Sequence, residues 1–211
     1  MAAIITNKFR IHNAEQYMEA FSETAATNTY LFIGRPQAWS DDTAPPTPAD
    51  NDDTAFNAYD DMVALKRVTS SDITHAVVRR NWTSGITYDE FEHNISSSNQ
   101  SNSGASSLFS ASFYVLTDDY NVYKVINNNG NAASTVKPTG TSTGFVTTAD
   151  GYVWKYMYTI SASDALKFLS TDFMPVKYVT SDPGAGQPYK EQWDTQQAAV
   201  DGEIRHIIIT N

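Results

Sequence analysis

Cysteine is absent from this sequence of 211 residues. The chain therefore cannot form a disulfide scaffold, a Cys-ligated zinc site, an iron–sulfur cluster or a thiol nucleophile. Basic residues are also scarce, since 14 lysines and arginines face 24 aspartates and glutamates, for a net charge of −10. Nucleic-acid binding needs a basic excess because contacts to phosphate supply most of its affinity, so we expect no nucleic-acid partner.

Long apolar runs and the common catalytic loops are missing as well. The strongest apolar stretches, 152–160 and 207–209, are short against the ~18 residues of a membrane span. Residues 1–8 lack the basic-then-apolar order of a signal peptide, so we expect no membrane partner. The sequence contains neither a phosphate-cradling glycine loop nor a Gly-x-Ser-x-Gly turn. We expect no cofactor.

The composition that remains is globular, with 41% hydrophobic and 12% aromatic residues. A domain averages roughly 150 residues. We therefore expect one β-rich region over 1–211, with two sub-domains and an inserted segment at about 83–150 as the alternative.

Hydrophobic periodicity predicts three short helices and many strands. The helices are expected at 14–25, 56–68 and 164–169, the first opened by Asn13 and the last by Ser161 or Ser163. The strands are expected at 2–6, 30–33, 73–80, 112–116, 120–126, 152–160, 176–180 and 203–210. We expect polar loops at 40–53 and 94–107, and a buried strand at 30–33.

Residues 152–160 show the clearest strand pattern. One face would carry Tyr152, Trp154, Tyr156, Tyr158 and Ile160, and both faces look covered, so this strand should be central in its sheet. The fold class we predict is α+β and β-rich, with layered, sandwich-like antiparallel sheets, a few short helices and long loops.

Acidic residues and histidines form no recognisable metal or catalytic motif. The aspartates around Asp50–Asp53 lack the spacing of a calcium loop and are interpreted as a solvated surface. The four histidines are far apart in sequence, and we expect His75 and His206 to be ordinary sheet residues. A carboxylate hydrolase would need two acids about 5 to 9.5 Å apart across a cleft. Its candidates are Asp89, Glu90, Glu92, Asp118 and Asp119.

The segment Arg79–Trp82 combines two guanidinium groups with an indole. Arginine and tryptophan are favoured at the centres of protein interfaces. With Trp39, the residues Arg79, Arg80 and Trp82 are our candidate interface residues. The alternative is a strand end whose tryptophan closes the core and whose arginines pair with nearby acids.

Several segments, taken in order, resemble the baseplate wedge subunit of T-even-type contractile-tailed bacteriophages, the gene product eight family. These segments are Ile5–Arg10, Phe32–Pro36, Trp39–Ser40, Ala44–Pro48, Asp61–Met62, Val77–Trp82, Asp150–Tyr156 and Ile207–Asn211. The resemblance implies a virion structural protein of the tail baseplate, assembled in the host cytoplasm. It also implies a homodimer that contacts other wedge proteins during viral tail assembly and has no enzymatic role.

Two departures from the family pattern bear on these expectations. A polar low-complexity stretch replaces family sequence at 94–107, and the final segment resembles an internal family strand. We therefore expect the protein's chain to continue beyond residue 211. The alternative function is a β-sandwich module that binds glycans on Trp39 or Trp193, which requires one of these rings to line an open groove.

Overall fold

The structure is a computed structural model that describes residues 7–23, 28–34, 39–41, 43–47, 50–177, 179, 181–187 and 189–198. Over these residues its elements are α1 (Asn7–Ala20), β1 (Thr29–Ile33), α2 (Asp52–Asp60), β2 (Ala64–Val68), η1 (Ser70–Asp72), β3 (Ala76–Val78), β4 (Tyr114–Leu116), β5 (Asn121–Asn127), β6 (Phe145–Thr147), β7 (Val153–Thr159), α3 (Ala162–Phe168), β8 (Phe173–Pro175) and α4 (Lys190–Ala198). All named strand pairs are antiparallel, which confirms the β-rich α+β class. The predicted strands 2–6 and 203–210 lie outside the described residues.

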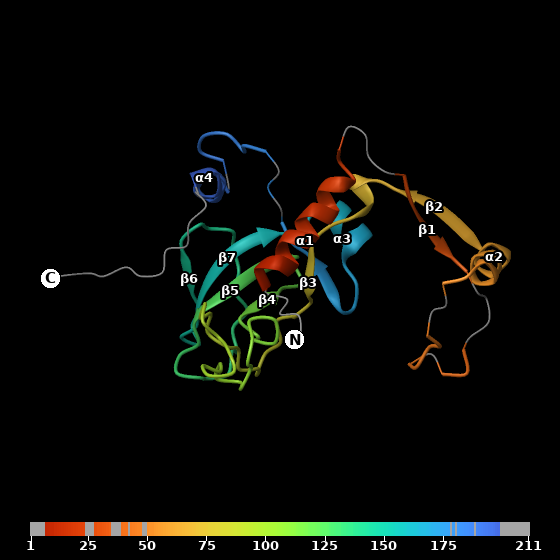
Figure 1. The fold of residues 1–211 in the computed structure, drawn as a ribbon. Coiled ribbons are helices and arrows are strands. Elements are labelled where there is room, and N and C mark those ends of the chain that lie inside the picture. Colours follow the sequence, from red (N-terminus) through yellow and green to blue (C-terminus); the bar gives the residue numbers. More distant parts are fainter. Residues whose placement is uncertain are drawn as a thin grey trace.

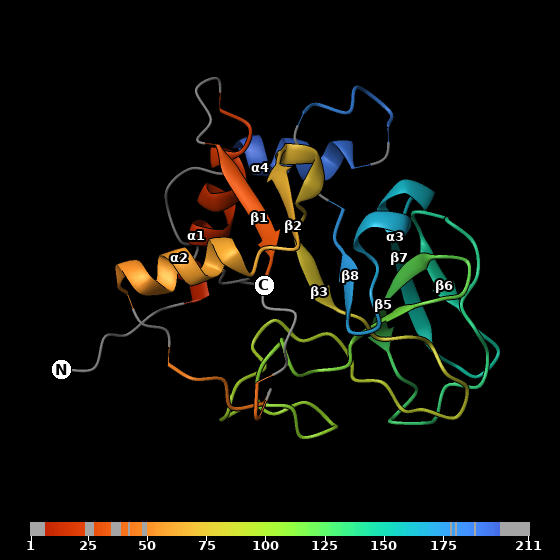
Figure 2. The same cartoon turned by 90° about the vertical axis from the view of Figure 1, so that its right-hand side faces the viewer.

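The largest sheet has four strands in the order β4-β5-β7-β6 (Figure 1). β7 is an inner strand, as its sequence predicts, although its second face is only partly covered. Two further sheets have two strands each, β1 with β2 and β3 with β8, and Figure 2 shows β3 and β8 next to each other. We did not predict β6 or α4, and β8 precedes the strand that we expected at 176–180.

Two hydrophobic clusters cover the faces of the four-stranded sheet. Because successive side chains of a strand point to opposite faces, β4 sends Val115 to the first cluster and Leu116 to the second. The buried residues of the first cluster are Tyr88, Val115, Tyr123, Val125, Tyr152 and Trp154. Those of the second are Leu116, Val122, Ile160 and Met174, against which α3 packs with Ala165.

A β-bulge in β7 corrects the predicted distribution of its side chains. Val122 pairs with Tyr158 whereas Tyr123 pairs with Tyr156, so Met157 is an extra residue in the ladder. An extra residue reverses the alternation of side chains beyond it. Tyr158 and Ile160 therefore join the second cluster instead of sharing a face with Trp154.

Helix boundaries differ from the predictions in the first third of the chain. The first helix spans 7–20 instead of 14–25, so Asn13 lies inside it and does not cap it. The segment predicted as a helix at 56–68 is a helix only to Asp60, and its second half is β2. The apolar spacing of Met62 and Leu65 suits a helix, but pairing with β1 decides the conformation.

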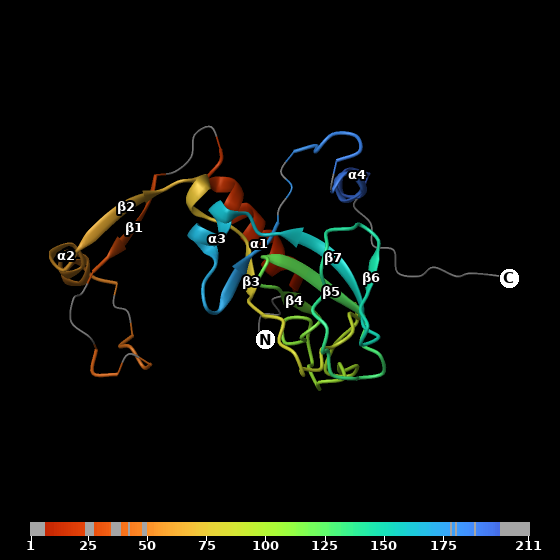
Figure 3. The same cartoon turned by 180° about the vertical axis from the view of Figure 1, so that it is seen from behind.

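The predicted burial of 30–33 is wrong. These residues form β1, but Leu31 and Ile33 are each 65% exposed. β1 and β2 pair only with each other among the described strands. We call β1, α2, β2 and the described residues between β1 and α2 the arm, and the arm extends away from the four-stranded sheet (Figures 1 and 3).

The polar loop at 94–107 is anchored by a buried carboxylate. Asp89, which is 1% exposed, accepts hydrogen bonds from the backbone N–H (2.9 Å) and hydroxyl (2.8 Å) of Ser103 and from the N–H of Ser112 (2.8 Å). Ile95 is also buried. The loop therefore gains from its neighbours the order that its own composition does not supply. Within the described part of the chain, no helix has the length and apolar character to cross a membrane.

Candidate functional site

The predicted interface segment Arg79–Trp82 follows β3 and runs along the edge of β4. The N–H of Leu116 donates to the carbonyl of Arg80 at 2.7 Å, and the N–H of Trp82 donates to the carbonyl of Leu116 at 2.8 Å. These two bonds form a parallel bridge that fixes the segment to the sheet. The bridge therefore fixes the backbone from which the side chains of Arg80 and Trp82 project.

Arg80 is half-buried and bonds to the segment that precedes β4. Its guanidinium donates to the hydroxyl of Ser112 at 2.9 Å and to the carbonyls of Phe109 and Ser110 at 3.2 and 3.0 Å. It also lies 5.8 Å from the ring centroid of Tyr114, within cation–π range. In the described part of the molecule its buried Nε atom has no hydrogen-bond partner.

Trp82 closes the first hydrophobic cluster, and its Nε1 donates to the hydroxyl of Ser134 at 3.1 Å. This arrangement agrees with the core-closing alternative for the tryptophan. The arginines differ from that alternative in their hydrogen-bond partners, because Arg79 donates to Asn81 (2.9 Å) and to the carbonyl of Ser170 (2.8 Å), neither of which is an acid.

A groove lies beside this segment, between the end of β3 and the β4–β5 turn. Arg79 and Trp82 line it together, whereas Arg80 does not. The lining residues are Arg79, Asn81, Trp82, Thr83, Leu116, Thr117, Asp118, Tyr120 and Lys137. Lys137 donates to Asp118 at 2.6 Å and also pairs with Asp119 at 3.4 Å. The Lys137 ammonium holds the pKa of Asp118 below its usual value.

Tyr120 occupies an unusual backbone position at the mouth of this groove. Its N–H donates to the carbonyl of Thr117, which closes the turn between β4 and β5, and its φ is 59°. This left-handed position in a three-residue hairpin loop favours glycine or asparagine and costs a bulky residue about 1 kcal/mol or more. Tyr120 nevertheless remains 46% exposed.

Trp39 lies apart from the other three predicted interface residues in the chain. It belongs to the segment between β1 and α2 and is 39% exposed. The structure therefore does not show one interface patch made of all four residues. It places Trp39 on the arm and the other three at the edge of the four-stranded sheet.

The arm carries an apolar surface that our sequence analysis missed. Phe56 and Tyr59 of α2 are 69% and 73% exposed. Tyr30, Leu31, Phe32, Ile33, Val63 and Leu65 are also exposed. Exposed apolar residues that gather on one element, as these do on the arm, are typical of protein-binding surfaces. The sequence contains no signal for it, because an exposed run such as Tyr30–Ile33 reads like a buried strand.

The acids proposed for a hydrolase each have an internal partner. The partners of Asp89, Asp118 and Asp119 are given above. Glu90 accepts a hydrogen bond from the N–H of Asn128 at 2.9 Å, and Glu92 accepts one from the side-chain amide of Asn99 at 3.2 Å. Within the described ranges, acids and histidines form no group of three or more that could hold a metal ion. His206 and the aspartate at 42 lie outside the described residues.

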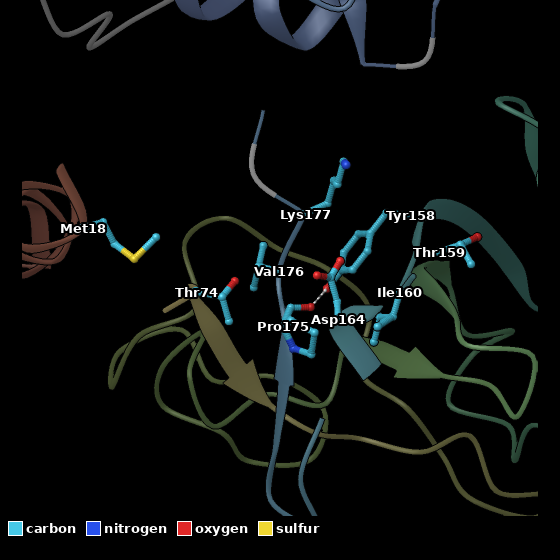
Figure 4. Close-up of a pocket in the computed structure, with 9 residues that line it drawn as sticks. All are labelled: Met18, Thr74, Tyr158, Thr159, Ile160, Asp164, Pro175, Val176 and Lys177. Atoms are coloured by element: carbon cyan, nitrogen blue, oxygen red, sulfur yellow. Dashed lines mark hydrogen bonds between the residues drawn. The ribbon is translucent and has the colours of Figure 1, made fainter. Parts of the chain in front are cut away.

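A smaller hollow lies between α1, the end of β7, the start of α3 and the end of β8 (Figure 4). Met18 on α1 stands apart from the other labelled residues. The Tyr158 hydroxyl donates to the carbonyl of Pro175 at 3.0 Å, and burial raises its pKa. Asp164 accepts from the hydroxyl of Ser161 at 2.8 Å within the helix cap. These polar groups are bonded within the fold, and the residues that line the hollow form no catalytic arrangement.

Comparison with known protein families identifies a family relationship. The family model of phage Gp8, described as Bacteriophage T4, Gp8, matches residues 3–135, which is more than half of the chain. The match includes the arm and Arg79–Trp82. Two of the segments that resemble the family, Asp150–Tyr156 and Ile207–Asn211, lie beyond it. No curated protein matches the chain. The chain belongs to the phage Gp8 family, a family of structural proteins of the phage tail baseplate.

Proposed function

We propose that this chain is a wedge subunit of the baseplate of a contractile phage tail, and that it acts through protein–protein contacts and not by catalysis. Family membership supports the baseplate role. The bonding of its acids supports the absence of catalysis, because Asp89, Glu90 and Asp118 are each engaged within the fold. The subunit would bind other wedge proteins during tail assembly in the host cytoplasm.

The exposed arm is the observation that carries this proposal. Aromatic side chains bury 150–250 Å² each, so four aromatic residues of the arm, which are half to three-quarters exposed, leave roughly 500 Å² on one protomer, and the four exposed aliphatic residues of the arm add to this area. A stable interface buries about 800 Å² per partner. Two arms that pack against each other would satisfy this requirement. We therefore assign the arm, including Trp39, to the contact between two copies in a homodimer.

The remaining predicted interface residues have a different role in this proposal. Arg80 and Trp82 hold the edge segment of β4 in place, and Arg79 borders the groove. We propose that Arg80 and Trp82 position the surface that neighbouring wedge proteins contact, and that Arg79 contributes to that surface directly.

The second candidate function is glycan binding. Trp39 is partly exposed and Trp193 is half-buried, but neither lines the groove beside Tyr120 or the hollow between α1 and β7. The feature that favours glycan binding is instead the groove, where an exposed aromatic ring stands among polar side chains.

The homodimer is tested by light scattering coupled to size-exclusion chromatography. We expect the wild-type protein to elute as a dimer and the double variant Phe56→Ser/Tyr59→Ser to dissociate with at least about a tenfold weaker Kd. Both side chains are largely exposed, so their loss leaves the folded protomer intact, which circular dichroism verifies. The matched control is Leu166→Ser on α3, a residue that is 89% exposed. A monomeric wild-type protein, or a double variant as dimeric as the control, contradicts the proposal.

A further inference from the structure

The groove beside Tyr120 is lined mainly by groups that can bind hydroxyls. Seven of its nine lining residues bear a hydroxyl, an amide or a charge. Protein partners need a cluster of apolar anchors in a desolvated centre. The arm offers such anchors, whereas only Leu116 and Trp82 in the groove are predominantly apolar. A polar ligand with many hydroxyls therefore fits the groove itself better than a second protein does, and the contact with neighbouring wedge proteins proposed above would be confined to the segment Arg79–Trp82 that borders the groove.

The charges around the groove are already balanced. Lys137 contacts both Asp118 and Asp119, while the Arg79 guanidinium donates to Asn81 and to the Ser170 carbonyl. A charged ligand would have to compete with these pairs and would gain little net attraction from two cations beside two carboxylates. The groove therefore favours a neutral ligand.

Tyr120 supplies the flat apolar surface that such a ligand needs. The residue is 46% exposed, on a turn position that glycine or asparagine would occupy without strain. Strained residues of this kind persist where the surrounding structure holds them, and they cluster at binding sites. An aromatic ring with polar neighbours matches a pyranose, which has an apolar C–H face and hydroxyls along its edge.

We propose that this groove binds a neutral oligosaccharide, with one sugar ring stacked on Tyr120 and its hydroxyls bonded to Asn81, Asp118 and Lys137. The proposal rests on the second candidate function and uses a surface that is distinct from the arm. Its failure is measured by sugar titration, whereas failure of the dimer is measured by light scattering without sugar, so the two outcomes are distinguishable.

The test titrates the full chain with neutral hexasaccharides, one of glucose and one of N-acetylglucosamine, and follows tyrosine and tryptophan fluorescence and saturation-transfer NMR. We expect saturable binding of at least one of them. Tyr120→Phe should retain it, because the ring remains. Tyr120→Asn should weaken it about tenfold or more, which is the loss of one well-placed contact. Asparagine accepts the left-handed backbone, so this variant keeps the turn.

The matched control is Phe109→Asn, which removes a ring that is 76% exposed and lies outside the groove. It should bind the sugar as the wild type does. The proposal is overturned if neither hexasaccharide saturates a signal by about 10 mM, or if Tyr120→Asn binds as tightly as Tyr120→Phe. It is also overturned if polyglutamate binds at this groove and the neutral sugars do not, because the groove would then be a site for acidic peptides.

Discussion

Asp150 shows how one carboxylate can fix a loop. It accepts hydrogen bonds from the backbone N–H groups of Thr135 (2.7 Å) and Val136 (2.9 Å), from the hydroxyl of Ser134 (3.2 Å) and from that of Thr148. Burial alone would raise its pKa, but these donors favour the ionised form and bring the pKa to about 2. The charged form of Asp150 therefore ties the 134–136 segment to the start of β7.

This pKa predicts a loss of stability in acid. The folded-state pKa lies below the ordinary aspartate value of 3.8, so Asp150 stabilises the folded state above about pH 4, and this contribution disappears as the pH falls toward 2. After allowance for partial exposure, we expect a loss of about 1 to 2 kcal/mol. Urea unfolding from pH 6 to pH 2 should show a smaller pH dependence in Asp150→Asn than in the wild type. Asp119→Asn serves as the surface control. If the free energy of unfolding of Asp150→Asn depended on pH as steeply as that of the wild type, the stabilising role of the Asp150 carboxylate would be refuted.

The structural roles of single residues could be predicted where these roles depend on residues nearby in the sequence. Ser161 accepts from the N–H of Asp164 at 3.1 Å, as the predicted helix cap requires. The asparagine- and glycine-rich segment 127–130, whose composition is typical of a turn, has Asn129 and Gly130 at φ 53° and 66°. Tyr120 could not be identified in this way, because its left-handed backbone and its groove depend on where β4, β5 and Arg79 meet in the fold. The roles of Arg79 and Trp82 were open between two alternatives for the same reason.

Among the elements, the arm is the part that sequence patterns describe least well. β1 and β2 form a two-stranded sheet of five residues per strand, which is marginally stable by itself in water. At its base, Lys66 contacts Asp72 in η1, and Asp72 also accepts from the N–H of Thr69 at 3.0 Å. Periodicity reports the apolar character of β1 but not whether another chain or the protein's own core covers it. The predicted burial of this strand was wrong for that reason.

The arm should respond to protein concentration in hydrogen exchange. In a dilute monomer, we expect the amides of β1 and β2 to exchange far faster than those of β5 and β7, whose pairing lies inside the four-stranded sheet. At concentrations that favour the dimer, the arm amides should become protected while β5 and β7 change little. Mass spectrometry of exchanged peptides measures both. Arm amides as protected as β5 at the lowest concentration would contradict an arm that needs a partner.

At the scale of the whole molecule, the β-rich class and the inner position of β7 could be predicted, because long alternating strands carry a strong periodic signal. The bulge at Met157 could not be predicted, because nothing in the local pattern marks the extra residue. The division of the chain into sub-domains, with an inserted segment at 83–150, stays a prediction. Family membership is shown over residues 3–135, which confirms the predicted resemblance to the gene product eight family and supports the baseplate role that composition alone does not indicate.

The central claim is that this chain is a structural baseplate subunit whose arm is covered by a second copy. Electron cryomicroscopy of the phage particle that contains it tests this claim most directly. We predict density for the β4-β5-β7-β6 sheet in the wedges of the tail baseplate, with Phe56 and Tyr59 of α2 buried against the arm of a neighbouring copy. Absence of the chain from the baseplate, or an arm exposed to solvent in the assembled particle, would contradict the account.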